Sequence, residues 1–592
     1  MKLLSFPSLT GLGHIFRINA PRHTVSALIA LGAVVFVLSG CRGNIITATT
    51  QSTITEDPSD EGGITPEQSE GNISIVFSES GAQVSGDEMG IVSVSGNDVT
   101  VNNGTENSYT YTLSGSCSDG FFKLYSSVKQ VIVLHSLSLT NPSGAAINNQ
   151  SHKYTSVILE GENYLADGAL SSSGAYPDET SEEDMKAAFF SEGQLVFSGS
   201  GSLKVSATGK AGITSDDYVR ITETPSITIT STGGHGLRGQ EKVLVEGGTL
   251  SITASATGKK GISTDGTFYQ SGGSVTIVST SSAGEVDGEV TGGAGIKADT
   301  AVTIEGGELS VTTSGSGAKG ISCDGEGRFT GGTVTVKTTG SNYGSSSGGS
   351  QGGPGGGFPG GGSGSSSSSD DSKSAKALKF EGNLYFDGAS VTASASSHEA
   401  IESKGTISIS GGSVSATSSD DAVNSGGDMT VSGGNVYAFS SGNDGLDANG
   451  NMYIKGGYVY AVGSGTPEVA LDANTEKRCQ LYVSGGSLMA FGGLESGANI
   501  TQPVVSVNSW SANTQYKLYN GDTLLLDFTS PSKGGNGMVL SHPDLVSGSS
   551  YTLKSGSSTT DTTLTASYSA SSSGGQGGQD RPGGGGGHGG RG

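Results

Sequence analysis

The sequence predicts an all-β protein, with a right-handed parallel β-helix in the middle of the chain and a small β module after it. Adjacent glycines recur along the chain, with an apolar residue two positions before the pair and another two positions after it in every unit except the one at Gly272. Between the pairs, apolar and polar residues alternate, as in Thr406-Ile407-Ser408-Ile409-Ser410. This period of two is typical of strands with one buried face, and no segment keeps a helical period.

The glycine pairs set the period of the repeat. Successive pairs are separated by steps of 22, 23 or 25 residues where no insertion intervenes. Short strands joined by a glycine corner at such intervals are typical of a parallel β-helix, in which each coil hydrogen-bonds to the next. The glycines would supply the positive φ angles of the corners. The first members of the pairs are Gly247, Gly272, Gly306, Gly331, Gly411, Gly433, Gly456 and Gly485.

Composition agrees with a solenoid and excludes several functions. Glycine accounts for 101 of 592 residues, an excess that indicates collagen, disorder or a solenoid according to its period. Lys and Arg number 31 against 55 Asp and Glu, so the net charge is 31 − 55 = −24. A chain this acidic is unsuited to nucleic acid and better suited to cations. Four cysteines are too few for a disulfide framework.

Residues 1–41 resemble a lipoprotein signal peptide. An apolar stretch from Val25 to Leu38 follows basic residues and precedes Ser39-Gly40-Cys41, which completes a sequence similar to the bacterial lipobox. We expect cleavage before Cys41 and lipidation of its thiol, which would anchor the protein in the bacterial cell envelope with its folded part exposed at the surface. The alternative is an ordinary secretory signal with an incidental cysteine.

The rest of the chain divides into four further parts by composition. Residues 42–72 are acidic and rich in Ser and Thr, which predicts a tether. Residues 73–500 hold the repeat, with a flexible Gly/Ser-rich insertion at 341–374. Residues 501–570 form the C-terminal module, and 571–592 a disordered glycine-rich tail. The module's expected strands are Val504 to Trp510, Gln515 to Tyr519, Thr523 to Phe528 and Tyr551 to Lys554.

A column of acidic side chains is the strongest functional signal. In each coil an apolar residue follows Gly or Ala, and in the last four coils the next residue is polar or acidic. Equivalent residues of neighbouring coils stack about 4.8 Å apart, so these side chains should form a column. Its members are Glu402, Asn424, Asp447 and Asp472, with Glu399, Asp420, Asp421, Asn443 and Asp444 just before the motif and Asn449 and Asn474 just after it.

Such a column predicts a bound cation. Like charges opposite one another on paired strands are destabilising, and a set of hard oxygen ligands is what calcium takes. In the alternative interpretation the Asp and Asn side chains cap turns and stack as a ladder, which suits Asn424, Asn449 and Asn474. For four single aspartates in Gly-Ile-x-x-Asp units the turn role is the better explanation: Asp216, Asp265, Asp299 and Asp324.

Two of these coils carry a family resemblance. Residues 420–427 and 442–450, each followed by an Ile/Val-x-Gly-Gly strand, look like the bacterial β-helical carbohydrate-binding domain family. The resemblance covers roughly residues 75 to 560. It implies a fold like that of pectate lyases, bound calcium, and attachment to cellulose and acidic plant polysaccharides without cleavage. The family's acidic positions match at Asp420, Asp421, Asp444 and Asp447, while Ala422 and Val423 replace a more usual Gly and Leu or Ile.

Two tyrosines are candidates for contact with sugar. Tyr437 and Tyr460 hold the same place after the glycine pair on adjacent coils, and alternation turns both rings outward. An outward aromatic pair could stack on sugar rings, or it could pack only against itself across the strands. An acidic sugar could also be held through calcium, which would bridge carboxylates of protein and ligand.

The enzyme alternatives have incomplete signatures. Asp216-Asp217 with His235 partly resembles the signature of polygalacturonases, but the flanking Asn-x-Asp and Arg-x-Lys elements are missing. A lyase would need a base near calcium, for which Lys404 is the nearest candidate. Arg238 and Arg328 lie coils away.

We therefore expect a non-catalytic, calcium-dependent, monomeric surface lipoprotein that binds polysaccharide, either cellulose or an acidic glycan such as polygalacturonate. The alternatives are a pectin-active lyase or hydrolase and a structural adhesin stalk.

Overall fold

The computed structural model describes residues 63–286, 288–344, 374–556 and 561–570. Within them the secondary structure is almost wholly β, with short 3-10 turns η1 (Pro66–Gln68) and η3 (Thr475–Lys477) and no α-helix. No helix in these ranges has the length and apolarity needed to cross a bilayer. The predicted signal peptide with Cys41, most of the tether and of the Gly/Ser-rich insertion, and the tail lie outside the described residues.

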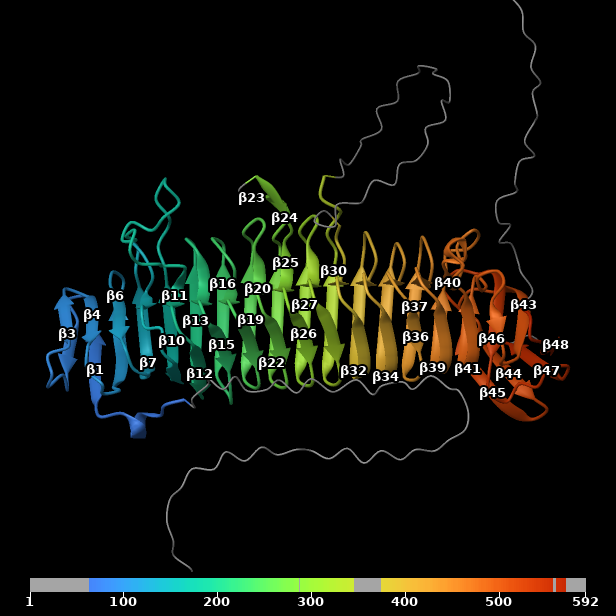
Figure 1. Ribbon diagram of the computed structural model, residues 1–592, viewed down its shortest axis with the longest axis horizontal. Helices are drawn as coiled ribbons and strands as arrows, with labels where there is room; N and C mark the ends of the chain where they lie inside the picture. Colours follow the sequence, from blue (N-terminus) through green and yellow to red (C-terminus); the bar gives the residue numbers. More distant parts are fainter. Residues whose placement is uncertain (1–62, 287, 345–373, 557–560, 571–592) are drawn as a thin grey trace, which may run out of the picture. The chain divides into compact units, whose positions relative to one another are not determined.

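The strands stack as coils of a parallel β-solenoid, which confirms the predicted β-helix (Figure 1). A 27-stranded sheet, here called sheet 1, and a 15-stranded sheet, called sheet 2, form its walls. A typical coil gives one strand to sheet 2 and two segments to sheet 1, on either side of the glycine pair.

Sheet 2 consists of β3 (Val92–Ser95), β4 (Asp98–Asn103), β6 (Phe121–Ser126), β8 (Ile147–Asn149), β11 (Ala187–Ser191), β14 (Ala211–Ser215), β17 (Leu237–Gly239), β20 (Lys260–Thr264), β25 (Ala294–Ala298), β28 (Lys319–Cys323), β31 (Leu378–Phe380), β33 (Ile401–Ser403), β35 (Val423–Ser425), β38 (Leu446–Ala448) and β40 (Leu471–Ala473). Before the glycine corners, sheet 1 contains β12 (Leu195–Gly199), β15 (Tyr218–Ile221), β18 (Lys242–Val245), β21 (Thr267–Gln270), β26 (Ala301–Ile304), β29 (Glu326–Phe329) and β36 (Met429–Val431). After the corners it contains β13 (Ser202–Ala207), β16 (Ser226–Ser231), β19 (Thr249–Ala254), β22 (Ser274–Ser279), β27 (Glu308–Thr313), β30 (Thr333–Thr338) and β37 (Asn435–Ser440). Strands that run through the corner are β32 (Leu384–Ala395), β34 (Ile407–Ser418), β39 (Met452–Val462) and β41 (Leu481–Phe491). At the N-terminal end sheet 1 includes β1 (Asn72–Phe77), β2 (Gln83–Ser85), β5 (Thr110–Cys117), β7 (Gln130–Thr140), β9 (Thr155–Glu160) and β10 (Glu162–Ala166), and at the C-terminal end β42 (Asn499–Ile500), β43 (Val504–Trp510) and β46 (Gly535–Ser541).

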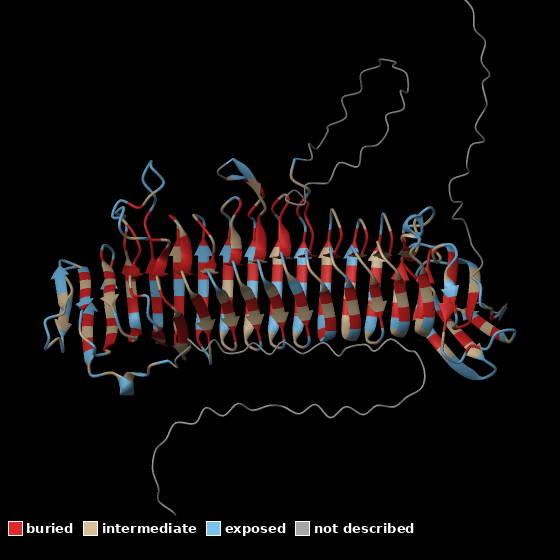
Figure 2. Ribbon diagram, viewed as in Figure 1, coloured by how far each residue is buried: buried red, intermediate tan, exposed pale blue. Residues whose placement is uncertain are grey.

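The core is a continuous stack of apolar side chains between the two sheets. Along β37, Val436 and Ala438 are buried while Asn435 and Tyr437 are exposed, and this alternation recurs from coil to coil (Figure 2). Because the strands pair in parallel register, each inward residue packs on its equivalent in the next coil, as Ile409, Val431 and Ile454 do. Outward positions are therefore also aligned in rows.

The glycine pairs form the corners, as the sequence predicts. Gly434 and Gly457, each the second of its pair, have φ of 74° and 79°. A Cβ on Gly433, the first of its pair, would lie 2.3 Å from the carbonyl oxygen of Ser410 in the preceding coil. The second glycine thus meets a conformational requirement and the first a steric one.

Parallel stacking gives way to antiparallel pairing at both ends of sheet 1 and at the N-terminal end of sheet 2. At one end β2 pairs with β1 and β3 with β4, and at the other β46 pairs with both β41 and β43. These antiparallel strands stop the parallel stacking, while β3 and β40 remain the edge strands of sheet 2.

The C-terminal module is only partly a separate sheet. β44 (Gln515–Asn520), β45 (Thr523–Thr529), β47 (Ser550–Ser555) and β48 (Thr562–Thr565) form a four-stranded antiparallel sheet of their own. The sequence predicted four of the module's strands but not β46, through which the module continues sheet 1. A two-stranded hairpin, β23 (Gly284–Val286) with β24 (Glu289–Thr291), projects from the coils.

We predict that Gly434→Ala destabilises the protein more than Gly96→Ala. Both glycines have positive φ, but a Cβ at Gly434 would lie 2.8 Å from the backbone of Gly411, whereas nothing lies within 4 Å of one at Gly96. Gly96→Ala should cost about 1 kcal/mol and Gly434→Ala about 2–4 kcal/mol in the free energy of unfolding, measured with denaturant. Equal losses would show that contact between coils does not constrain the corner.

Candidate binding sites

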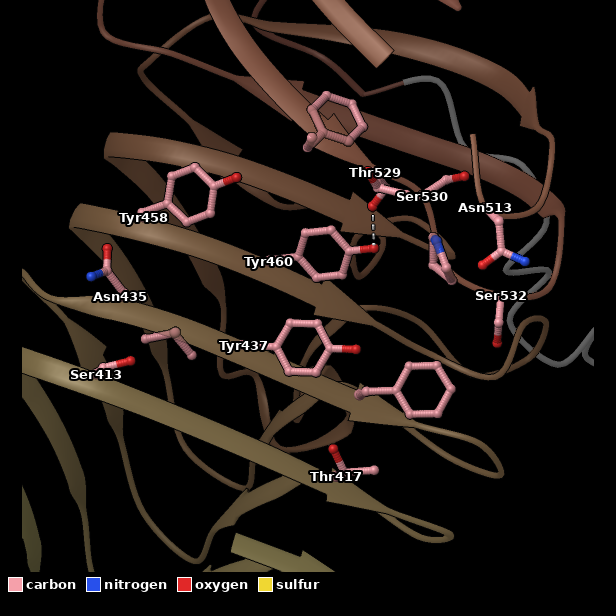
Figure 3. Close-up of a pocket in the computed structure, with 14 residues that line it drawn as sticks. Ser413, Thr417, Asn435, Tyr437, Tyr458, Tyr460, Asn513, Thr529, Ser530 and Ser532 are labelled. Carbon is pink, nitrogen blue, oxygen red and sulfur yellow. Dashed lines mark hydrogen bonds between the residues drawn. The ribbon is translucent and has the colours of Figure 1, made fainter. Parts of the chain in front are cut away.

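A pocket of about 870 Å³ lies where the C-terminal module meets sheet 1 (Figure 3). Its floor is the outward face of β34, β37 and β39, and its wall comes from Asn513 and the segment after β45. The lining residues are Ser413, Thr417, Asn435, Val436, Tyr437, Phe439, Tyr458, Tyr460, Asn513, Phe528, Thr529, Ser530, Pro531 and Ser532.

The two predicted tyrosines lie together on this floor. Tyr437 and Tyr460 are register partners, with ring centroids 5.1 Å apart and an angle of 21° between the planes. The Tyr460 hydroxyl donates a hydrogen bond of 2.9 Å to the carbonyl of Thr529, which fixes this ring against the module (Figure 3). Tyr437 is 42% exposed. The pair therefore offers one fixed and one accessible aromatic ring.

The pocket combines aromatic rings with uncharged polar groups. Its lining contains no Asp, Glu, Lys, Arg or His among the described residues. Amides of Asn435 and Asn513 and the hydroxyls of Ser413 and Thr417 supply donors and acceptors. An apolar surface with a few placed polar groups is typical of small-molecule sites, and this set suits a neutral sugar ring.

The acidic column lies on the outward face of sheet 2. Register pairs Glu402 with Asn424, Asn424 with Asp447, and Asp447 with Asp472, as the sequence predicts. A second row, three residues earlier in each coil, contains the buried carboxyl groups of Glu399, Asp421 and Asp444.

The aspartates of the column repel one another in a poorly hydrated site. Burial, and then repulsion by neighbouring carboxylates, raises the pKa of Asp444 and Asp447 to about 8. Burial raises the pKa of Asp421 to about 6, and burial together with Glu495 raises that of Asp472 to about 8. Ionising these groups costs free energy unless a cation binds between them.

One amide bridges two of the aspartates. The side-chain nitrogen of Asn424 donates to Asp421 Oδ2 at 3.0 Å and to Asp447 Oδ2 at 2.7 Å. The backbone N–H groups of Asp444 and Val469 donate to Asp421 and Asp444 respectively, at 3.1 and 2.5 Å. The carboxylates are thus oriented by the protein.

Glu402 has a different environment from the aspartates. It forms ion pairs with Lys376, with Lys379 at 3.3 Å and with Lys404 at 2.6 Å. Burial tends to raise its pKa, but attraction to Lys376 and Lys379 prevails and lowers it to about 2. Lysine ammonium groups already occupy the position that a metal ion would take beside this carboxylate.

Glu399 lies at the boundary between the two environments. Its carboxylate is 3.4 Å from Lys376 Nζ and contacts His398, which is also 3.2 Å from Asp420. His398, Glu399 and Asp420 offer ligand atoms within 4.8 Å of one another, but Lys376 already compensates Glu399.

The remaining predicted ligands behave as a turn ladder. Asn443 donates to Asp420 at 3.0 Å, and Asn474 to Asn449 at 3.4 Å. Asn474 also accepts from the backbone of Lys477 and caps η3. For these residues the structure favours the capping alternative.

The structure does not bring the tyrosines and the acidic column together. The tyrosines face outward from sheet 1 and the aspartates from sheet 2. Tyr458, another floor residue, could have been found from the sequence because it lies two residues before Tyr460 on the same strand. Asn513 carried no comparable signal, since it lies in a loop of the module.

The residues of the enzyme alternatives are engaged in other contacts. Asp216 forms an ion pair with Lys186, and Arg238 pairs with Asp265 at 2.8 Å. His235 Nδ1 accepts from the backbone of Lys260, and burial lowers the pKa of this histidine well below its usual range. These contacts lend no support to a hydrolase or lyase.

We predict that without divalent cations the protein loses stability as pH rises. The carboxyl groups of Asp444, Asp447 and Asp472 keep protons up to about pH 8 in the folded state but lose them near pH 4 when unfolded. Between these values the folded state binds more protons, so the free energy of unfolding falls as pH rises. Melting temperatures measured in chelator across this window should fall, and Asp447→Asn should flatten the decline. A melting temperature that rises over the window would contradict this account.

Comparison with known proteins supports a carbohydrate-binding domain. A solved structure described as a polysaccharide lyase-like protein from C. thermocellum, gadolinium derivative, is 23% identical, with a TM-score of 0.35, over 43% of this chain and 96% of that one. No curated protein matches. The model of the family called carbohydrate-binding domain-containing protein matches residues 95–422, more than half of the chain. The chain therefore belongs to the carbohydrate-binding domain-containing protein family.

Proposed function

We propose that this protein is a non-catalytic, calcium-dependent lipoprotein that binds plant-type polysaccharide at the cell surface. The observation that carries the proposal is the uncharged pocket floored by Tyr437 and Tyr460, in a chain of a carbohydrate-binding family. Aromatic rings with neutral hydrogen-bonding groups can hold a sugar without any group placed to cleave it. Within the two glycan classes expected from the sequence, the pocket favours the neutral one, such as cellulose.

Calcium would be held by the aspartates of sheet 2. Asp421, Asp444, Asp447 and Asp472 provide hard carboxylate oxygens. Asp421 and Asp444 are buried, and Asn424 and backbone donors orient Asp421, Asp444 and Asp447. This donor set fits calcium, whose charge would relieve the repulsion that raises the pKa of each group. Glu402 is left out of the proposed set because three lysines already compensate it. In this proposal calcium stabilises the coils rather than taking part in a reaction.

The location of the protein is also a proposal. A lipidated Cys41 would tether the solenoid to the envelope through the acidic segment that follows it. A monomer is expected, because antiparallel end strands interrupt, in sheet 1, the parallel stacking that end-to-end association of two solenoids would continue.

Retention of the purified protein on insoluble glycans separates the functional alternatives. The protein would be incubated with cellulose and with polygalacturonate, with and without chelator, and the supernatant assayed for released sugar. Retention without products supports the proposal, and loss of retention in chelator supports calcium dependence. Unsaturated or reducing-end products would overturn it in favour of an enzyme, and retention on neither glycan would favour the adhesin stalk.

We predict that Tyr437→Ala weakens binding of soluble cello-oligosaccharides about tenfold, because one aromatic stacking contact contributes about 1.4 kcal/mol. The matched control is Tyr453→Ala. Tyr453 stacks on Tyr482 with ring centroids 5.0 Å apart, on the coil of Tyr460 and the coil after it, but neither residue lines the pocket. Titration calorimetry should show a loss of affinity for Tyr437→Ala only. Equal affinities of the two variants would exclude the pocket as the sugar-binding site.

We predict that Asp447→Asn lowers calcium affinity by about tenfold or more, because it removes a charged oxygen ligand from the centre of the column. The control is Asp324→Asn, an aspartate directly after β28 that forms an ion pair with Lys297 at 2.6 Å. Calcium titration should be unchanged in the control. If both variants bind calcium like the parent protein, the proposed site is wrong.

A further inference from the structure

The outward face of sheet 1 is lined with hydroxyl groups over seven consecutive coils. β16, β19, β22, β27, β30, β32 and β34 pair in parallel register, and each presents three outward positions. Of these 3 × 7 = 21 positions, 18 are Ser or Thr, the exceptions being Val278, Glu308 and Lys337. We call this surface the hydroxyl face. Its middle row is Thr228, Ser251, Thr276, Ser310, Thr335, Thr392 and Ser415.

These hydroxyls are accessible and not used by the fold. Thr228, Thr276, Thr335 and Thr392 are exposed, and no side chain of the middle row forms a hydrogen bond within the described residues. Hydroxyls at the turns behave differently, because they bond to carbonyls of the preceding coil, as Thr339 does to Thr313 at 3.3 Å. The fold thus needs hydroxyls at its turns, whereas those of the flat face remain available to a ligand.

The rows are regular in both directions. Along the stack, equivalent hydroxyls repeat at about 4.8 Å, so six steps span about 29 Å, and neighbouring rows are about 6.7 Å apart. Glu308 and Lys337 are the only charged residues among the 21 positions of this face, although the chain carries a net charge of −24. A regular, nearly uncharged array of hydroxyls matches a neutral polymer that itself carries hydroxyls at a regular repeat.

The hydroxyl face is continuous with the pocket. In register, the row that contains Ser415 continues to Tyr437 and then Tyr460. Ser413 and Thr417, in the last strand of the face, already line the pocket. The pocket lies at one end of the hydroxyl face, because the C-terminal module contacts sheet 1 at Tyr460, through Thr529.

We propose that the hydroxyl face and the pocket form one surface for a single extended chain of neutral polysaccharide, which lies along the stack of coils. The terminal sugar units stack on Tyr437 in the pocket, and the following units exchange hydrogen bonds with the rows of Ser and Thr. Polyuronates are disfavoured on this face, since Lys337 is its only cationic side chain. This inference rests on the proposed function and specifies its substrate class and the length of ligand it engages.

The test compares short and long ligands. A cello-disaccharide fills only the pocket, whereas a hexasaccharide also reaches the hydroxyl face. The variant Thr276→Val/Thr335→Val/Thr392→Val removes three hydroxyls but keeps β-branched side chains on exposed strand positions, so folding should be retained. The control Thr303→Val/Thr430→Val changes outward threonines of sheet 1 on the other side of the glycine corners.

The parent protein should bind the hexasaccharide at least about tenfold more tightly than the disaccharide, in titration calorimetry, through added hydrogen bonds. The triple variant should lose most of the extra affinity for the hexasaccharide and keep its affinity for the disaccharide. The control variant should keep both affinities. A triple variant that still binds the hexasaccharide more tightly than the disaccharide by the same factor as the parent protein would overturn the proposal.

Other outcomes would also overturn it. Loss of retention on insoluble cellulose with unchanged hexasaccharide affinity would mean that the face docks on a packed glycan surface. Sedimentation that shows a dimer in the parent protein and a monomer in the triple variant would assign the face to a second copy of this chain. Failure of the proposed function has a different signature, namely disaccharide binding that is absent or insensitive to Tyr437→Ala.

Discussion

Parallel, in-register hydrogen bonding between successive coils is the constraint on which the rest of this structure depends. It places each residue on its equivalent in the next coil. A residue type that recurs at one position of the repeat therefore forms a row along the solenoid. Rows of apolar residues make the core, rows of glycine make the corners, and rows of hydroxyls make a flat face. Stacking repeats a weak interaction along the solenoid, which is why short strands without helices can form an extended flat surface.

The same constraint makes like charges costly, and sheet 2 shows how the chain manages them. One outward row passes from Arg238 through Lys297 and Lys379 to Glu402, and then to Asp447 and Asp472. Where the charge along this row changes from positive to negative, Lys376 and Lys379 form ion pairs with Glu402, and all three side chains are almost fully buried. Beyond that boundary the aspartates have mainly one another as charged neighbours, and their pKa values rise. The proposed calcium ion would neutralise these aspartates, as the lysines neutralise Glu402 one coil earlier.

Features that recur in the repeat could be predicted from the sequence, and features that depend on its interruptions could not. The glycine corners, the alignment of Asp447 with Asp472, and the pairing of Tyr437 with Tyr460 follow directly from equal spacing. The lysine partners of Glu402 were missed because Lys376 and Lys379 come just after the Gly/Ser-rich insertion, where the repeat cannot be counted. The wall of the pocket was missed because Asn513 and residues 530–532 lie in loops of the C-terminal module, outside the repeat.

In our proposal, sugar and calcium occupy different faces of the solenoid, the sugar on sheet 1 and the calcium on sheet 2. The most direct measurement is a crystal structure of the protein grown with calcium and a cello-oligosaccharide. We expect sugar rings against Tyr437, beneath the loop that carries Asn513, and an ion among Asp421, Asp444 and Asp447 with no sugar contact. A sugar bound at the aspartates through calcium, with the tyrosine pocket empty, would contradict it.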